Sequence, residues 1–191
     1  MTDHSGVGII ITDFRIRSML NITDLGRGKM RKHRIVALLF MLLTVAGCLS
    51  SCTSKSVPKA FEYEGMKIIL TSSFGEEEVE GPDKSFVSDK MAVFVIREGF
   101  DLVEGFGDYD IDGYTQLCLE ANDMVGKEVK KLNGIPYFEF ESDVDGEPYT
   151  YVAFTYKGTD AFWLIQFVTA SGDTEKMRSE IETYASSVTF S

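Results

Sequence analysis

The amino-acid sequence predicts an α+β domain, with one antiparallel β-sheet of about six to seven strands and helices packed on both of its faces. Short runs rich in β-branched and aromatic residues recur between residues 61 and 169, and turn-forming residues separate them. Two segments, 114–125 and 177–188, instead carry apolar residues at helical spacing. Of the 23 aromatic residues in the chain, 21 follow residue 47, which is ample core material for both faces of a sheet.

The first half of the domain supplies four expected strands, at residues 61–63, 66–70, 86–89 and 91–98. Gly65 forms the turn between the first two. Residues 74–84 are expected to form a solvated loop, because they contain the acidic run 76–78 together with Gly81 and Pro82. Residues 92–96 are apolar at every position, which is typical of a strand that is buried on both faces.

A helix is expected after the acidic stretch 101–112. Its apolar residues recur at three- and four-residue intervals and form one stripe: Tyr114, Leu117, Cys118, Ala121, Met124 and Val125. Cys118 lies on this stripe, and free cysteine usually behaves as a small buried hydrophobic residue. We therefore expect Cys118 to be buried under the helix.

Three strands and a second helix complete the expected order of elements. The strands, at 135–142, 149–157 and 160–169, are joined by turns at Asp145-Gly146 and Gly158-Thr159. These turns predict the following cross-strand pairs: Phe138 with Ala153, Phe140 with Tyr151, Tyr137 with Phe154, Ala153 with Leu164, Phe154 with Trp163, and Val152 with Ile165. The helix follows Asp173 as its N-cap, and Thr189-Phe190 forms a last short strand. Its stripe consists of Met177, Ile181, Tyr184, Ala185 and Val188.

The segment that precedes the domain has the features of a secretory signal. A basic cluster, Arg31 to Arg34, is followed by an uncharged apolar run from Ile35 to Ala46 and then by small residues. That run is shorter than the roughly 20 apolar residues that a membrane-spanning helix needs. Val45-Ala46-Gly47-Cys48 resembles the lipobox of bacterial lipoproteins, in which the cysteine thiol receives a diacylglyceryl group and becomes the mature N-terminus.

This pattern divides the chain into four parts. Residues 1–29 are an over-extended start or a long n-region, and residues 30–47 are the lipoprotein signal peptide. Residues 48–59 form a flexible polar tether, and residues 60–191 form one globular domain. The chain would be anchored in the cell membrane through lipidated Cys48, with its domain on the extracytoplasmic side.

Charge and the absence of histidine exclude several functions. Residues 1–47 hold 7 of the 19 basic and 3 of the 30 acidic residues, so residues 48–191 hold 12 basic and 27 acidic residues, a net charge of −15. Such a balance argues against binding to nucleic acid or to anionic lipid. Both histidines, His4 and His33, precede Cys48. The mature chain therefore lacks Ser-His-Asp catalysis, Cys-His catalysis and any histidine-ligated zinc.

One acidic motif invites comparison with a calcium site. Asp108, Asp110 and Asp112 followed by Gly113 match the first, third, fifth and sixth positions of an EF-hand loop. The twelfth position should be a bidentate glutamate, but it is Leu119. A weak Ca²⁺ site is therefore one interpretation, and an acidic loop in which Asp112 caps the following helix is the other.

Two further groups of side chains have chemical potential. Glu139 and Glu141 fall on one face of a strand, and paired carboxylates perform glycoside hydrolysis when one of them has a raised pKa. Strand alternation near an exposed edge is the simpler interpretation. Tyr149 and Tyr151 share the other face, where they would either stack on a sugar or belong to the core. A disulfide between Cys52 and Cys118 is left open.

The order of elements and four packing segments, at residues 65–70, 134–140, 160–167 and 186–190, carry a resemblance that covers residues 60–190. The domain resembles the PsbP-like domains, a fold shared by a photosystem extrinsic subunit, a Ran-binding nuclear import factor and many bacterial lipoproteins. The resemblance implies an antiparallel sheet with helices on both faces. It brings no catalytic residue, and it implies a protein that acts by binding partners.

We therefore expect a lipid-anchored, non-enzymatic module that binds a protein or another component of the envelope. The alternatives are a calcium-dependent binding module that uses Asp108, Asp110 and Asp112, and an envelope glycan hydrolase that uses Glu139 and Glu141. The sequence leaves open the oligomeric state, the binding partner, and whether the tether faces a cell wall or a periplasm.

Overall fold

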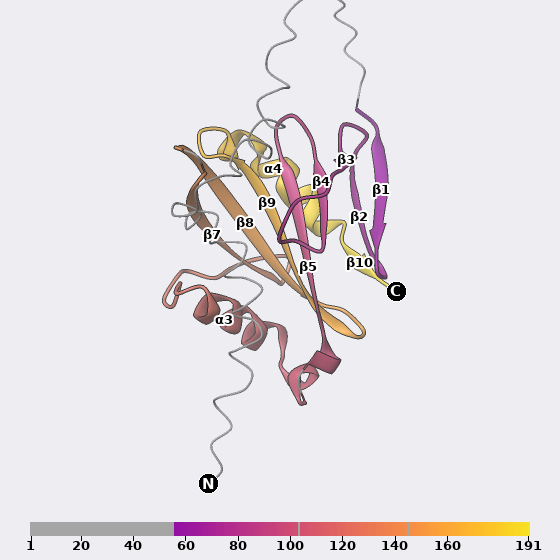
Figure 1. Ribbon diagram of the computed structural model, residues 1–191, viewed down its shortest axis with the longest axis vertical. Helices are drawn as coiled ribbons and strands as arrows, with labels where there is room; N and C mark the ends of the chain where they lie inside the picture. Colours follow the sequence, from indigo (N-terminus) through magenta and orange to yellow (C-terminus); the bar gives the residue numbers. More distant parts are fainter. Residues whose placement is uncertain (1–55, 103, 145) are drawn as a thin grey trace, which may run out of the picture.

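The computed structural model describes residues 56–102, 104–144 and 146–191. In this part of the chain, ten strands, two short 3-10 helices and two α-helices follow one another (Figure 1). The strands are β1 Pro58–Tyr63, β2 Met66–Thr71, β3 Gly75–Glu76, β4 Lys84–Val87, β5 Ala92–Gly99, β6 Lys130–Leu132, β7 Ile135–Val144, β8 Glu147–Lys157, β9 Ala161–Ala170 and β10 Thr189–Phe190. The helices are η2 Phe100–Leu102, η3 Phe106–Asp108, α3 Ile111–Ala121 and α4 Thr174–Ser186.

The strands form two antiparallel sheets. The large sheet has seven strands in the order β3-β4-β5-β9-β8-β7-β6, and the small sheet has the order β1-β2-β10. The α+β class and the seven-stranded sheet agree with the sequence prediction. The prediction of a single sheet is wrong, because β1 and β2 leave the large sheet and pair with the last strand of the chain. Met66 lies opposite Phe190 and Lys67 lies opposite Thr189.

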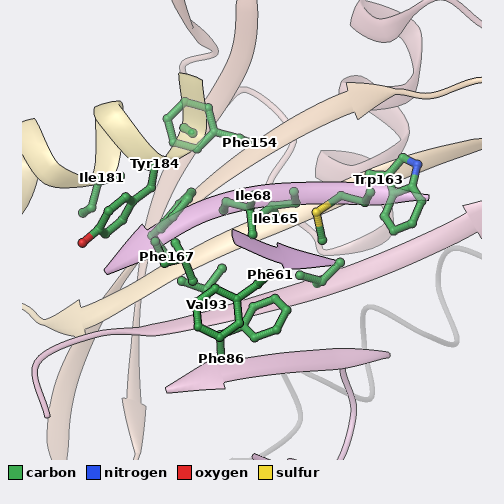
Figure 2. Close-up of a cluster of buried hydrophobic side chains, with 14 of the residues drawn as sticks. Phe61, Ile68, Phe86, Val93, Phe154, Trp163, Ile165, Phe167, Ile181 and Tyr184 are labelled. Atoms are coloured by element: carbon green, nitrogen blue, oxygen red, sulfur yellow. The ribbon is translucent and has the colours of Figure 1, made fainter. Parts of the chain in front are cut away.

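Each face of the large sheet has its own apolar cluster. On one face, side chains of β5, β8 and β9 pack against α4 and the small sheet, which supply Phe61, Ile68, Ile181 and Tyr184 (Figure 2). On the other face, α3 covers a second cluster that includes Tyr114 and Cys118. The expected helices on both faces are therefore present, and the small sheet is an additional cover on the α4 side (Figure 1). Cys118 is fully buried, as the helical stripe predicts.

The meander β7-β8-β9 is formed as predicted in one of its two pairings. Phe138 lies opposite Ala153, Phe140 opposite Tyr151, and Tyr137 opposite Phe154. Between β8 and β9 the predicted register is wrong by two residues. Phe154 pairs with Ile165, Val152 with Phe167, and Trp163 with Tyr156.

This register shift has its origin in the turn between β8 and β9. Lys157 pairs with Phe162, and the amide of Gly158 donates to the carbonyl of Ala161 at 2.8 Å, so the turn has four residues instead of two. A shift of two residues leaves every side chain on its predicted face, because the side-chain period of a strand is two. The predicted assignment of side chains to the two sheet faces is therefore correct, although the predicted register is wrong.

The start of α3 differs from the sequence prediction, whereas α4 follows Asp173 as its N-cap, as predicted. Asp110, rather than Asp112, is the N-cap of α3, and its carboxylate accepts from the amide of Gly113 at 2.7 Å. The helix ends at Ala121, so Met124 and Val125 of the expected stripe lie beyond it, and Val125 is 76% exposed. At the N-cap of α4, the Asp173 carboxylate makes no capping hydrogen bond and instead binds the Lys176 ammonium at 2.6 Å.

Candidate functional site

The lipobox cysteine lies outside the described residues. Cys48 and Cys52 both precede residue 56, and the first strand begins at Pro58, ten residues after Cys48. Among the described residues, no helix is long and apolar enough to cross a membrane. Cys118 is a free, buried thiol, enclosed between α3 and the large sheet. A disulfide between Cys118 and Cys52 would therefore require α3 to open.

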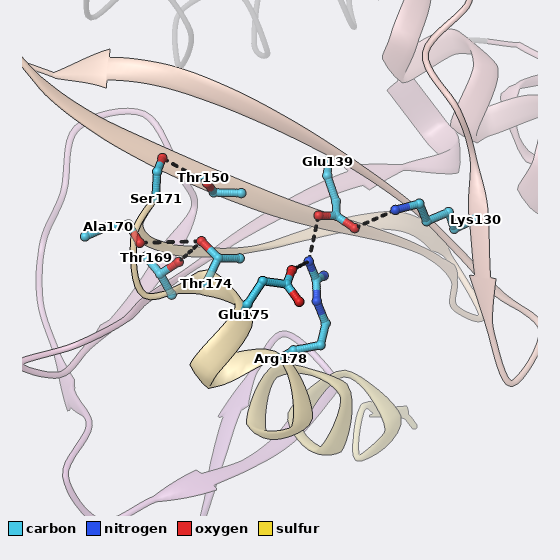
Figure 3. Close-up of polar contacts among 9 residues, drawn as sticks. All are labelled: Lys130, Glu139, Thr150, Thr169, Ala170, Ser171, Thr174, Glu175 and Arg178. Carbon is cyan, nitrogen blue, oxygen red and sulfur yellow. Dashed lines mark hydrogen bonds and ion pairs between the residues drawn. The ribbon is translucent and has the colours of Figure 1, made fainter.

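Glu139 forms the centre of a charged network that joins α4 to the large sheet (Figure 3). Its two carboxylate oxygens accept from Arg178 at 2.8 Å and from Lys130 at 3.2 Å. The same guanidinium nitrogen of Arg178 also binds Glu175, one helical turn earlier, at 2.8 Å. Thus β6, β7 and α4 each contribute a charged side chain, and the network fixes the side of α4 that faces the sheet.

The electrostatics of Glu139 are the opposite of what a general acid needs. Burial acts to raise the pKa of its carboxyl group, but Arg178 and Lys130 outweigh burial and hold this pKa below its ordinary value. The pKa of the Arg178 guanidinium is raised in turn, because its bonds to Glu139 and Glu175 outweigh its own burial. Glu141 lies on the same strand face but is exposed. The raised pKa that the hydrolase hypothesis needs is therefore not found at Glu139.

The three aspartates of the EF-hand-like motif have separate roles. Asp110 caps α3, Asp108 ends η3, and Asp112 binds the Lys131 ammonium at 2.8 Å from the first turn of the helix. Among the described residues, no group of three or more histidine, cysteine or acidic side chains is placed to hold a metal ion. The loop conformation is explained by capping, as the alternative interpretation of the motif proposed, with Asp110 in place of Asp112.

The two tyrosines of β8 differ in burial. Tyr151 is 7% exposed, and its ring stacks on Phe140 with centroids 4.7 Å apart. Burial, together with neighbouring Tyr149, raises the pKa of Tyr151. Tyr149 packs against the same cluster and is only partly buried. The core interpretation therefore holds for Tyr151.

A shallow hollow lies at the turn between β1 and β2, next to β10. Its volume is about 370 Å³, and its lining includes Tyr63, Met66 and Phe190. The amide of Ser191 donates to the carbonyl of Gly65 at 3.0 Å and closes one side. The lining contains neither histidine nor cysteine, and its charged side chains belong to Glu62, Glu64 and Lys67.

One group of polar side chains was missed by the sequence interpretation. Glu98 of β5 is buried under α3, close to the hydroxyl of Tyr114 and the thiol of Cys118. The signal was present, because Ala92, Phe94 and Ile96 alternate along β5 on the face that α3 covers. The same alternation carries Glu98 onto that face.

Comparison with known proteins gives structural matches only. No family model matches the chain, and no curated protein matches it. The chain is similar to the solution structure of cyanobacterial PsbP (CyanoP) from Synechocystis sp. PCC 6803, with 14% sequence identity and a TM-score of 0.48 over 76% of this chain and 98% of that one. A PsbP structure is thus among the matches, as the sequence resemblance predicted.

Two further solved structures show similar levels of likeness. A protein from Bacteroides thetaiotaomicron has 14% identity and a TM-score of 0.46, over 66% of this chain and 45% of that one. LpqN, a Mycobacterium tuberculosis protein involved in cell envelope biogenesis, has 10% identity and a TM-score of 0.43, over 73% of this chain and 87% of that one.

Proposed function

We propose that this chain is a bacterial lipoprotein whose domain is held at the outer side of the membrane by Cys48 and binds a protein or another envelope component without catalysis. The observation that carries the proposal is the segment 31–48, in which a basic cluster, an apolar run and Val45-Ala46-Gly47-Cys48 follow one another. Acylation at a single cysteine by a diacylglyceryl group supplies two chains, which is enough for stable anchoring.

Two properties of the domain support a binding role over a catalytic one. No histidine follows His33, and the carboxylate with the best position for acid–base chemistry, Glu139, is ion-paired to Arg178 and Lys130. The net charge of −15 in residues 48–191 favours a partner that is neutral or basic on the contacting surface.

The anchoring is tested by expressing the full chain in a bacterial host and separating its membranes from its soluble fraction. The wild-type chain and the Cys52→Ala variant should stay with the membranes and be released only by detergent. The Cys48→Ala variant should lose this detergent-dependent retention. Equal distribution of the two variants would refute the assignment of Cys48.

The binding role is tested by chemical cross-linking of the full chain in intact cells, followed by purification under denaturing conditions. One partner cross-linked in stoichiometric amount, and bound again by the purified chain in detergent, would support the proposal. Release of sugars from envelope glycan by the wild-type chain, lost in the Glu139→Gln variant, would refute the non-catalytic role.

A further inference from the structure

Part of β7 forms a free edge of the large sheet (Figure 1). On one side, β7 pairs with β8 over residues 137–144. On the other side, β6 has three residues and pairs with residues 135–137 alone. Among the described strands, none pairs with residues 138–144 on this second side. This stretch of β7 therefore offers its main-chain groups to another strand.

The direction of the main-chain hydrogen bonds follows from the turn between β6 and β7. Asn133 and Gly134, both with positive φ, form this two-residue turn, and Leu132 and Ile135 lie opposite each other on its two sides. Residues that flank a two-residue turn form a hydrogen-bonded pair, and successive residues of a strand bond to opposite neighbours. The odd-numbered residues of β7 therefore face the β6 side, and the even-numbered ones bond to β8. Beyond the end of β6, three residues of β7 direct their N–H and C=O groups to the outside: Glu139, Glu141 and Asp143.

The side chains at these three positions are acidic, and strand alternation places them on one face of the sheet. Glu139 shows which face this is, because its carboxylate binds Arg178 of α4 at 2.8 Å (Figure 3). Lys130 binds the same carboxylate at 3.2 Å, so Glu139 is neutralised within the domain. Glu141 and Asp143 are exposed instead. These two side chains are therefore placed to attract a cation from outside.

A second copy of this chain is a poor occupant of the edge. In an antiparallel pair of two β7 edges, the hydrogen-bonded positions would all be odd-numbered, because only those residues have outward main-chain groups. Acidic side chains would then lie directly opposite one another, and like charges at opposite positions destabilise a strand pair. Charged side chains commonly protect edge strands from self-association in this way. A strand with basic residues at the same positions would replace the repulsion by attraction.

We propose that the β7 edge binds an extended basic segment of a partner protein as an added antiparallel strand, with lysine or arginine opposite Glu141 and Asp143. Main-chain hydrogen bonds to residues 139, 141 and 143 hold the segment, and the two pairs of opposite charges select it. The net charge of −15 in residues 48–191 adds a long-range attraction. This inference rests on the binding role proposed above and specifies the chemistry of the partner.

The other face of the added strand would meet Phe140, which lies between Glu139 and Glu141 on β7. Phe140 belongs to the apolar cluster under α3, is 7% exposed, and stacks on Tyr151 with centroids 4.7 Å apart. An apolar partner residue opposite Phe140 would extend this packing across the edge. Starting opposite Asp143, the expected partner segment therefore has a basic residue, any residue, a second basic residue and an apolar residue.

The test follows the main-chain amides of the full chain in detergent by NMR spectroscopy, with the blocked peptide Thr-Lys-Thr-Lys-Val-Thr as the probe. The amides of Glu139, Glu141 and Asp143 should shift and become protected from exchange. Those of Phe138 and Phe140 are already bonded to β8 and should keep their protection. A peptide with glutamate in place of both lysines should not bind. N-methylation of a lysine amide should abolish binding, because this N–H faces β7, and methylation of the threonine amide between the lysines should not.

Glu141→Lys is the variant of choice, because the Asp143 carboxylate also accepts from the amide of Gly146 at 2.7 Å and its replacement would disturb the turn. Glu141→Lys should bind the lysine peptide roughly tenfold more weakly than wild type, and the glutamate peptide more tightly. Glu78→Lys is the matched control. It makes the same change of net charge at an exposed residue after β3, at the opposite edge of the sheet, and it should bind as wild type.

Four results would overturn the proposal: no change at the three β7 amides, binding of the peptide that is methylated at a lysine amide, undiminished binding to Glu141→Lys, or a change of the same amides by self-association of the chain without peptide. The proposed binding role is judged separately. A partner found by cross-linking, together with a β7 edge that the lysine peptide leaves unchanged, would keep that role and remove β7 as its site.

Discussion

Two glutamates of this domain have opposite surroundings. Glu139 lies between two cations, Arg178 and Lys130, whereas Glu98 lies against two weak acids, Tyr114 and Cys118. The charge of Glu139 therefore stabilises the folded state. Sequence alternation placed Glu139 on the correct face of its strand, but the two cations come from β6 and α4, whose positions relative to β7 no local pattern reveals.

Replacing Glu139 by glutamine should lower the free energy of unfolding by about 1 kcal/mol at pH 7, a typical contribution of an ion pair that is only partly exposed. The folded-state pKa of Glu139 is lowered, so its stabilising effect is present above the unfolded pKa of about 4.3 and is lost as the pH falls through the folded pKa. Urea unfolding at pH 7 and at pH 3 should show a larger difference from wild type at pH 7 than at pH 3.

Glu141→Gln is the matched control, since Glu141 is an exposed carboxylate on the same strand face. It should unfold with the wild type at both pH values. A Glu139→Gln variant as stable as wild type at pH 7 would mean that Arg178 and Lys130 do not hold the carboxylate in solution.

At the level of the elements, the start of α3 explains the acidic motif that resembles a calcium loop. Asp110 accepts the hydrogen bond of an otherwise unpaired helical amide, that of Gly113, while Asp112 points to Lys131. The sequence identified the correct cluster of aspartates, and it predicted the wrong capping residue. Asp110 and Asp112 both fit the sequence pattern of an N-cap. Only the backbone conformation, which is extended at Asp110, shows that Asp110 is the capping residue.

Asp110→Ala should destabilise the domain by about 1 kcal/mol, the usual cost of removing an N-cap side chain. Asp112→Ala removes only an exposed ion pair and should have little effect. Chemical unfolding of the two variants beside the wild type compares them. If Asp112→Ala were less stable than Asp110→Ala, Asp112 would be the capping residue instead.

Millimolar calcium should leave the midpoint of thermal unfolding unchanged, because Asp110 and Asp112 already have partners and the bidentate glutamate is missing. The measurement is thermal denaturation with calcium, with magnesium and with chelator. An increase in midpoint that depends on calcium and disappears in Asp108→Asn would contradict this prediction.

The turn between β8 and β9 shows why register was harder to predict than pairing. The β7-β8 connection has the two-residue spacing of a common hairpin, and its register was correct. In the β8-β9 connection, Gly158 looks like a hairpin glycine but lies against Trp163. A Cβ atom at residue 158 would approach the indole nitrogen to 2.8 Å and the carbonyl oxygen of Ala161 to 3.3 Å.

Gly158→Ala should therefore destabilise the domain by about 1–3 kcal/mol, the usual range for overpacking. Gly172→Ala is the control, because no atom lies within 4 Å of its added Cβ atom. It should be neutral or slightly stabilising. The fluorescence of the single tryptophan, Trp163, follows both unfolding curves, and equal stabilities of the two variants would contradict the close packing at Gly158.

For the molecule as a whole, the class and the central sheet could be predicted because they depend on local alternation and spacing. The small sheet could not, because β10 reaches β2 across more than 120 residues and consists of Thr189 and Phe190 alone. The edge strand β6 was also missed. The Asn133-Gly134 pair before β7, with positive φ angles of 51° and 87°, is the local signal that could have found it.

The measurement that decides whether this domain is membrane-tethered is the mass of the N-terminal peptide of the mature protein. The full chain is expressed in a bacterial host, extracted from its membranes with detergent and digested. We predict that the mature chain starts at Cys48 and that its thiol carries a diacylglyceryl group. An unmodified peptide that runs from Gly47 through Cys48 would contradict the proposal, and the domain would then have to act without the anchor.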